Sequence, residues 1–351
     1  MGNSAATAHV EVDGLAVFDF DFPRELIAQY PARERDQARL MVVERTHGEI
    51  HHRRFSEIDG WLNEGDALVI NDSRVVPARL QAHKEGGGAV ELLVLGTDAD
   101  GTVSVMFRSR GGLRPATQLA LDDGTPALVI APVQNGRCRL DLGGVDVARL
   151  LAELGRVPLP PYIKRPPEPL DEERYQTVFA RRDGSVAAPT AGLHFSDRLL
   201  TKLKRKGVLV RTVTLHVGPG TFVPVRGDLD GHEMEAELCR VGATVADELQ
   251  EVRNQGRRIV AVGTTSVRTL ESACRSDGRL GSFQAPSSLF IRPGYAFRVV
   301  DALVTNFHLP RTTPICLLLA FAGPELLRRA YDEAVRERYR FYSYGDAMLV
   351  V

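Results

Sequence analysis

The sequence predicts an α/β protein with two kinds of folded part: an open sheet covered by helices on both faces, and a small antiparallel β-barrel or sandwich. Strand-like and helix-like segments alternate through the second half of the chain, which is typical of an open α/β sheet. Between residues 71 and 144, short β-like runs are separated by glycine and aspartate turns, a rhythm typical of a small barrel or sandwich.

The segment before residue 71 predicts the first elements of the sheet part. The chain turns helical after Pro23, because proline is favoured at the first position of a helix. Residues 39–45 (RLMVVER) are typical of a strand, residues FSEIDGWLNEGD of a short helix, and residues 67–72 of an apolar strand. We expect the first dozen or so residues to be an unstructured leader.

The segment after the β-rich region predicts a helix followed by an extended stretch. Residues 145–157 have helical spacing, and residues 158–169 contain six prolines in twelve residues. Such a stretch is extended, since proline removes a backbone donor and breaks a helix. It is either a junction between domains or a strap packed against the sheet part. The strands and helices expected beyond it are residues 196–207 (helix), 208–217 (strand), 242–256 (helix), 257–263 (strand), 264–275 (helix), 302–307 (strand) and 324–341 (helix).

Composition excludes several classes of protein. The chain has 351 residues with 44 basic and 45 acidic side chains, so binding to a nucleic acid would need a local basic patch on a neutral body. No stretch reaches the roughly 18 apolar residues of a membrane-spanning helix, and residues 1–12 lack a signal pattern, so we expect a cytoplasmic protein. The cysteines form no CxxC pair and the histidines no HExxH motif, so we expect no metal site.

Three predicted strands end in polar, glycine-bearing or histidine-bearing segments. These are residues 216–222 (HVGPGTF), 263–266 (GTTS) and 306–310 (NFHLP). Ligands of open α/β sheets bind beyond the carboxyl ends of the strands, so we expect the three segments to converge on one crevice.

Two readings remain open for the GTTS segment. Thr264, Thr265 or Ser266 could simply cap the helix that follows, or the free backbone N–H groups there could bind an anionic ligand group. Likewise Gly218 and Gly220 could let the backbone approach a ligand or could form only a tight turn. Residues 216–222, which contain both glycines, lack the GxGxxG spacing of a dinucleotide-binding loop.

Eight segments together resemble one known family in order and spacing. They are NDSRVVPARL, PLPPYIKR, ERYQTVFA, AAPTAGLHF, TLHVGPGTFVPV, AVGTTSVRTLES, TNFHLP and YRFYSYGDAML. The family is that of the S-adenosylmethionine:tRNA ribosyltransferase-isomerases of queuosine biosynthesis, and the resemblance extends from about Phe18 to the C-terminus.

The resemblance implies a reaction, its substrates and a domain arrangement. The ribosyl group of S-adenosylmethionine would be transferred and isomerised onto 7-aminomethyl-7-deazaguanine at the wobble position of tRNA, giving epoxyqueuosine, adenine and methionine. S-adenosylmethionine would be a co-substrate, with no other cofactor, and we expect a monomer. The family fold implies an α/β catalytic domain (residues 1–70 and 145–351) interrupted by an inserted β-barrel domain (residues 71–144).

This chemistry assigns roles to be tested. The sulfonium acidifies the adjacent ribose C5′ hydrogen, so a general base must remove that proton and a donor should assist the departure of adenine. The acid–base candidates are His216, His308, His194 and Glu271. The candidates for binding S-adenosylmethionine are Gly218, Gly220, Thr221, Phe222, Gly263, Thr264, Thr265 and Arg268. The candidates for binding the tRNA base are Asn306, Asp346, Asn71 and Arg74.

Two positions depart from the family pattern. Glu235 stands where the family usually has the second histidine of a His-x-Met-His-x-Glu motif, and Pro314 follows TNFHLP where the family has a different short run. These departures motivate one alternative, an S-adenosylmethionine-dependent enzyme of the same fold with another acceptor. A relative that binds RNA without catalysis is the other alternative.

Overall fold

The computed structural model describes residues 20, 22–222, 229 and 231–351, without the side chains of residues 221 and 222. The N-terminal leader expected from the sequence therefore lies outside the described residues. After Pro23 the chain forms only a 3₁₀ turn, Arg24–Leu26, instead of the expected longer helix.

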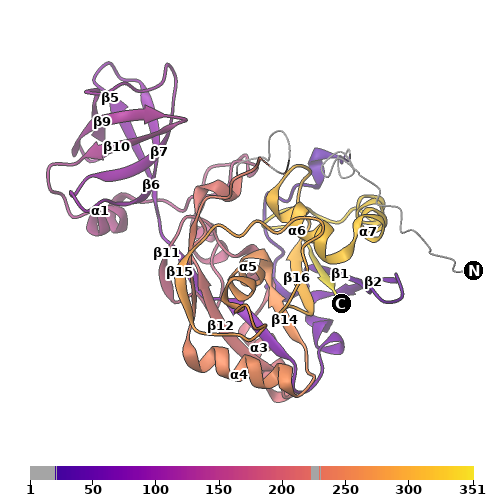
Figure 1. Ribbon diagram of the computed structural model, residues 1–351. Helices are drawn as coiled ribbons and strands as arrows, with labels where there is room; N and C mark the ends of the chain where they lie inside the picture. Colours follow the sequence, from indigo (N-terminus) through magenta and orange to yellow (C-terminus); the bar gives the residue numbers. More distant parts are fainter. Residues whose placement is uncertain (1–19, 21, 223–228, 230) are drawn as a thin grey trace, which may run out of the picture.

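The larger part of the protein is built on a nine-stranded mixed sheet with the order β15-β13-β12-β3-β14-β16-β17-β1-β2 (Figure 1). Its centre consists of the parallel strands β12, β3, β14 and β16, whose carboxyl ends lie at the same edge. The flanking strands run antiparallel to a neighbour, except that β17 and β1 are parallel to each other. The strands are β1 (Arg39–Val43), β2 (Ile50–Arg54), β3 (Ala67–Asn71), β12 (Leu209–Leu215), β13 (Glu237–Val241), β14 (Ile259–Val262), β15 (Phe283–Ser287), β16 (Ala302–Asn306) and β17 (Ala347–Val350).

Helices cover both faces of this sheet, as the alternation of strands and helices predicts. Along β3, Ala67 and Val69 pack into one apolar core, and Leu68 and Ile70 pack into the core on the opposite face. The first core includes residues of α4 (Ala243–Asn254), α5 (Gly263–Ala273), α6 (Thr313–Ala322) and α7 (Pro324–Arg336). The second includes α3 (Asp197–Arg205) and the 3₁₀ helix Phe55–Trp61. Because each strand residue faces one layer or the other, these strands read as continuous apolar runs.

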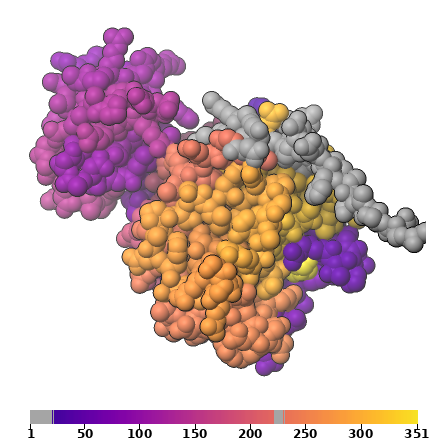
Figure 2. Space-filling model, in the orientation of Figure 1, coloured from indigo at the N-terminus to yellow at the C-terminus, as the bar shows by residue number. Residues whose placement is uncertain are grey.

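The smaller part is a closed six-stranded antiparallel barrel with the order β10-β7-β6-β5-β8-β9. It forms a separate lobe beside the sheet domain (Figures 1 and 2). Its strands are β5 (Arg79–Lys84), β6 (Ala89–Thr97), β7 (Val103–Ser109), β8 (Gln118–Leu121), β9 (Pro126–Gln134) and β10 (Arg137–Asp141). They lie within the segment 71–144, but Asn71 itself ends β3 of the large sheet, and α1 (Val147–Leu154) packs on the barrel through Leu150.

The two connections of the barrel meet at a narrow neck. The backbones of Arg79 and Arg156 exchange two hydrogen bonds, of 3.2 and 2.9 Å. Closer to the sheet domain, the chain entering the barrel forms β4 (Ser73–Val75), which pairs in parallel with β11 (Arg182–Ser185). Beyond the neck, the proline-rich segment is a strap, since Leu159 and Ile163 are buried in a small apolar cluster that leads to α2 (Pro169–Arg174).

Candidate functional site

A pocket opens at the edge of the sheet where the central parallel strands end. The structure brings all three predicted strand ends to it, although the segment after β12 contributes only Val217. The residues that line the pocket are Tyr162, Tyr175, Ala187, Ala188, Pro189, Thr190, Ala191, Val217, Gly263, Thr264, Thr265, Thr305, Asn306, His308, Thr312, Pro314, Tyr342 and Ser343. Five of the residues proposed from the sequence are therefore together in one place: Gly263, Thr264, Thr265, Asn306 and His308.

The first turn of α5 faces this pocket with free backbone donors. Gly263 adopts φ +83°, a conformation that glycine tolerates best, and it turns the chain from β14 directly into the helix. The residue before the helix, Val262, provides no side-chain cap, and the hydroxyl of Ser266 donates to the Val262 carbonyl instead. The Thr265 hydroxyl is buried without a hydrogen-bond partner among the described residues. The simple capping role is therefore not seen, and this helix start can accept an anionic group.

His308 follows β16 and presents a neutral imidazole to the pocket. Its Nε2 lies 2.8 Å from the Thr305 hydroxyl, and its backbone N–H donates to the Tyr331 hydroxyl over 2.9 Å. Burial of the ring lowers the pKa of His308 to about 4, so the ring is uncharged at neutral pH. When Nε2–H donates to Thr305, Nδ1 carries the lone pair that a general base requires.

Asn306 lines the pocket but already uses its amide inside the protein. Its Oδ1 accepts from the Thr190 hydroxyl (3.0 Å), and its Nδ2 donates to the Tyr342 carbonyl (3.1 Å) and to His194 Nε2 (3.1 Å). The side chain is only 1% exposed. Asn306 therefore holds neighbouring pocket residues in position, which differs from the direct recognition of a base expected for it.

His194 stands behind Asn306 and does not line the pocket. Because it accepts from the Asn306 amide, its Nε2 is unprotonated. Burial lowers the pKa of His194 to about 4, against a smaller opposing effect of Asp346. The acid–base role expected for His194 is therefore replaced by a positioning role.

His194 should make the protein less stable in mild acid. Its folded pKa of about 4 lies below the unfolded value of about 6.5, so between these values the unfolded chain binds an extra proton. The free energy of unfolding should therefore fall as the pH decreases, by about 2 kcal/mol between pH 7 and pH 5 from this residue. Urea unfolding at both pH values should show that His194→Gln removes this part of the loss, whereas His47→Gln, at an exposed turn, does not. Equal losses in His194→Gln and the wild type would contradict the prediction.

Glu271 was expected to be catalytic, but the structure places it away from the pocket. Its carboxylate is 1% exposed and accepts hydrogen bonds from the backbone N–H groups of Arg298, Val299 and Val300 and from the Tyr295 hydroxyl. A carboxylate with its acceptor sites so occupied anchors a loop and is not free to move a proton.

Replacing Glu271 by glutamine should therefore affect stability and not chemistry. An amide carries one acceptor oxygen where the carboxylate has two, so one or more buried N–H groups lose their partner, at a cost of about 1–3 kcal/mol in unfolding free energy. Turnover per folded molecule should stay at the wild-type level. Urea unfolding and an activity assay on the same preparation would check both parts, and a stable but inactive Glu271→Gln variant would restore the catalytic role.

Four more candidates lie outside the pocket with local structural partners. His216 is half-buried, its Nδ1 lies 2.8 Å from the Ser73 hydroxyl, and burial lowers its pKa. Asn71 bridges β3 to Leu215 at the end of β12, through hydrogen bonds of 2.9 and 3.1 Å. Asp346 accepts from the backbone N–H groups of Arg39 and Arg340. Arg74 is exposed and lies 3.6 Å from Asp183.

The glycine segment after β12 is tied to α5 by a buried ion pair. Glu237 accepts from the backbone N–H of Gly218 (2.8 Å) and from the guanidinium of Arg268. Arg268 also donates to the carbonyls of Leu289 and Ser287, so it links α5 to the β15 region. Neither Gly218 nor Arg268 lines the main pocket, although Arg268 borders an adjoining hollow that shares Thr264, Thr265 and Pro314 with it. The side chains of Thr221 and Phe222 lie outside the described part of the chain.

The two unusual positions have simple structural settings. Glu235 lies 2.5 Å from Arg137 of β10, so it joins the barrel to the segment before β13, and it also sits close to Gly220. Pro314 occupies the first turn of α6, where a missing N–H costs nothing, and it lines the pocket. Both residues are therefore compatible with the fold, and only Pro314 reaches the pocket.

Sequence reasoning missed a group of tyrosines. Tyr162 comes from the proline-rich strap, Tyr175 follows α2, and Tyr342 lies in the segment before β17, yet all three line the pocket. Their motifs, PLPPYIKR, ERYQTVFA and YRFYSYGDAML, carried part of the family resemblance, but no spacing rule connects three irregular segments so far apart in the chain.

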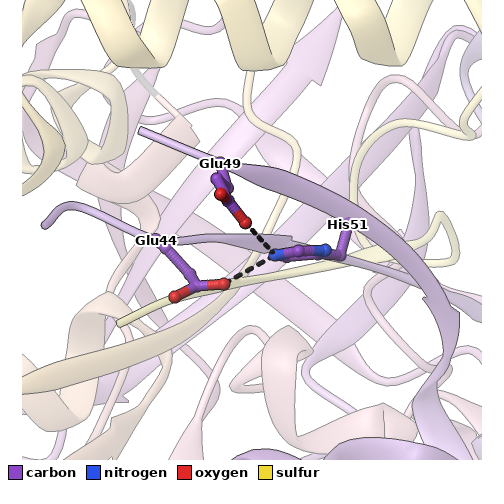
Figure 3. A group of neighbouring side chains, drawn as sticks. All are labelled: Glu44, Glu49 and His51. Atoms are coloured by element: carbon purple, nitrogen blue, oxygen red, sulfur yellow. Dashed lines mark hydrogen bonds and ion pairs between the residues drawn. The ribbon is translucent and has the colours of Figure 1, made fainter. Parts of the chain in front are cut away.

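A group with metal-ligand chemistry lies away from this pocket. Within the described ranges, only Glu44, Glu49 and His51 bring three such side chains together (Figure 3). They lie at the hairpin of β1 and β2, at one edge of the large sheet, where His51 Nε2 is 2.6 Å from Glu44 and 3.5 Å from Glu49. These contacts form an ion-pair network when His51 is protonated, and none of the three residues lines the pocket.

Comparison with known proteins decides the family. The family model described as "Queuosine biosynthesis protein" matches residues 15–350. This chain belongs to that family. It is 51% identical to an S-adenosylmethionine:tRNA ribosyltransferase-isomerase of Anaeromyxobacter dehalogenans, over 96% of this chain and 99% of the relative. It is 48% identical to the protein of the same name from Pelobacter propionicus, over 95% and 98% of the two chains.

A solved structure supports the fold of this family member. The crystal structure of an S-adenosylmethionine tRNA ribosyltransferase from Thermotoga maritima is 38% identical to this chain and has a TM-score of 0.56. The match covers 95% of this chain and all of that one. Among the described residues, no helix is long and apolar enough to span a membrane.

Proposed function

We propose that this chain transfers and isomerises the ribosyl group of S-adenosylmethionine onto 7-aminomethyl-7-deazaguanine at the tRNA wobble position, giving epoxyqueuosine and releasing adenine and methionine. The proposal rests on full-length similarity to ribosyltransferase-isomerases. The observation that carries it within the structure is one pocket that joins a neutral histidine, His308, to the uncapped start of α5.

The pocket supplies groups for both ends of the co-substrate. The backbone N–H groups at the start of α5, with the hydroxyls of Thr264 and Thr265, suit the carboxylate of the methionine moiety. His308 is uncharged, so its free nitrogen can take the proton from ribose C5′, where the adjacent sulfonium favours the loss. Thr305 orients the imidazole through Nε2.

The proposal also covers the cofactor requirement, the oligomeric state and the cellular location. S-adenosylmethionine is consumed as a co-substrate, and the reaction uses no further cofactor. The enzyme acts as a monomer in the cytoplasm, where tRNA is modified. The tRNA must reach a pocket that lies in the sheet domain, and the Arg137–Glu235 pair connects the barrel to that same domain.

A turnover experiment tests the function. The protein is incubated with S-adenosylmethionine and tRNA carrying 7-aminomethyl-7-deazaguanine, and adenine release and nucleoside mass are followed. Adenine together with epoxyqueuosine in the tRNA would establish the proposal. Binding of S-adenosylmethionine without adenine release would favour another acceptor, and S-adenosylhomocysteine as product would identify a methyltransferase. Binding of RNA without any turnover would indicate a relative that binds RNA but does not catalyse the reaction.

A further inference from the structure

Two tyrosines form a stacked aromatic pair in the wall of the pocket. The rings of Tyr162 and Tyr342 lie 3.7 Å apart between centroids with only 12° between their planes. Both residues line the pocket, one from the strap and the other from the segment before β17. Rigid, planar side chains of this kind are the usual surface on which a nucleobase stacks.

The backbone holds Tyr342 in a costly conformation. Its φ of +69° lies in the left-handed region, which non-glycine residues rarely adopt. Three hydrogen bonds maintain it: its N–H donates to the Phe307 carbonyl (2.9 Å), and its carbonyl accepts from Gly345 N–H (2.9 Å) and from Asn306 Nδ2 (3.1 Å). Strain that persists only because surrounding groups enforce it is concentrated at ligand sites. Asn306 is thus a positioning residue for this ring.

A third tyrosine places a hydroxyl that makes no well-formed hydrogen bond next to the pair. Tyr175 is 1% exposed, and among the described residues no group meets its hydroxyl with good hydrogen-bond geometry, although Ser343 and the Ala188 backbone lie beside it. Burial raises the pKa of Tyr175, so the hydroxyl keeps its proton at neutral pH. An unpaired buried hydroxyl is unfavourable, and a ligand atom that accepts from it would remove that cost. By contrast, the Tyr162 hydroxyl is already 2.5 Å from Ser343 Oγ.

We propose that the Tyr162–Tyr342 pair and the Tyr175 hydroxyl form the subsite for a purine-type ring. The ring would stack on the tyrosine pair, and a ring heteroatom would accept a hydrogen bond from Tyr175. This inference rests on the proposed function, which brings two such rings to the protein: the adenine of S-adenosylmethionine and the 7-deazaguanine of the tRNA. The chemistry of recognition is the same for both, and the test separates them.

Matched substitutions test the subsite. Tyr342→Leu and Tyr162→Leu remove a ring while keeping an apolar side chain, and Tyr342→Phe and Tyr162→Phe keep the ring. The dissociation constants of S-adenosylmethionine and of modified tRNA are measured separately, by calorimetry and by filter binding. Each leucine variant should lower the affinity for one of the two ligands by about 5- to 150-fold, the range expected for one stacked base. The phenylalanine variants should keep most of the wild-type affinity. Tyr30→Leu, at an exposed tyrosine outside the pocket, is the control.

The pattern of losses identifies the ring. If only the affinity for S-adenosylmethionine falls, the subsite holds adenine. If only the affinity for modified tRNA falls, it holds the deazaguanine. Leucine variants that melt like the wild type and bind both ligands with unchanged affinity overturn the proposal. If the leucine variants do not fold, Tyr175→Phe decides, because it removes one oxygen and breaks no well-formed hydrogen bond within the protein. Unchanged affinity for both ligands then refutes the subsite.

The same series separates this inference from the proposed function. Adenine release by the wild-type protein is measured first. If the wild type binds S-adenosylmethionine but releases no adenine, the proposed reaction fails, and the binding constants of the tyrosine variants still report on the subsite.

Discussion

Replacing His308 by glutamine is expected to lower kcat for adenine release by about 10²- to 10⁴-fold, the contribution typical of a positioned general base. Glutamine can keep a hydrogen bond to Thr305 but cannot take up a proton, so the dissociation constant of S-adenosylmethionine should change little by comparison. Steady-state kinetics with calorimetry on the same variant would measure both quantities. His83→Gln, at an exposed position on the barrel, is the control.

The pH dependence of the wild type gives a second measure of the same role. Burial lowers the pKa of His308 to about 4, so the basic form is present at neutral pH and is lost only as the pH falls through that value. The acidic limb of kcat/KM due to this residue should therefore lie near pH 4 and not near 6.5, and it should be absent in the variant. Full activity in His308→Gln would assign the proton transfer to another group.

Replacing Arg268 by methionine should lower the free energy of unfolding by about 3–5 kcal/mol, the cost of breaking a buried ion pair from one side. Glu237, only 6% exposed, would lose its ion pair with the Arg268 guanidinium, and the carbonyls of Leu289 and Ser287 would lose their donor. Urea unfolding measures this effect. The double variant Arg268→Met/Glu237→Gln should recover part of the loss, since it also removes the buried carboxylate charge that Arg268 balances in the wild type.

A surface ion pair provides the comparison. Arg149 and Glu153 pair across one turn of α1 with both side chains more than half exposed, so Arg149→Met should change stability by less than about 1 kcal/mol. If Arg268→Met were as stable as Arg149→Met, the buried pair would not be the link between α5 and the β15 region that the geometry indicates.

The main features of the fold were predictable because they follow from local patterns. Continuous apolar runs predicted the central strands, and regular turns predicted the barrel strands, both of which are confirmed. The mixed character of the sheet was not predictable, because the antiparallel placement of β17 beside β16 depends on tertiary packing. The proline-rich sequence is compatible with either a domain junction or a packed strap, and the burial of Leu159 and Ile163 shows that it is a strap.

The site was predictable only where parallel strands end. Thr264 and His308 were found because β14 and β16 end at the same edge. Glu271 was a catalytic candidate and Asp346 a candidate for binding the tRNA base, but the carboxylates of both accept hydrogen bonds from backbone N–H groups. A sequence does not distinguish this structural use of a carboxylate from a chemical one. The tyrosines were missed because they lie on irregular segments, whose approach in space leaves no periodic signal.

The neck of the barrel makes that lobe an interchangeable module. The chain leaves and returns through residues whose backbones are already hydrogen-bonded, at Arg79 and Arg156, so the two ends of the insertion are neighbours. A short turn could therefore close the sheet domain after excision of the lobe, because insertions whose ends lie close together can be gained or lost without moving the surrounding core. The same adjacency would let a barrel from a relative be grafted at this point while the residues that line the pocket stay in place.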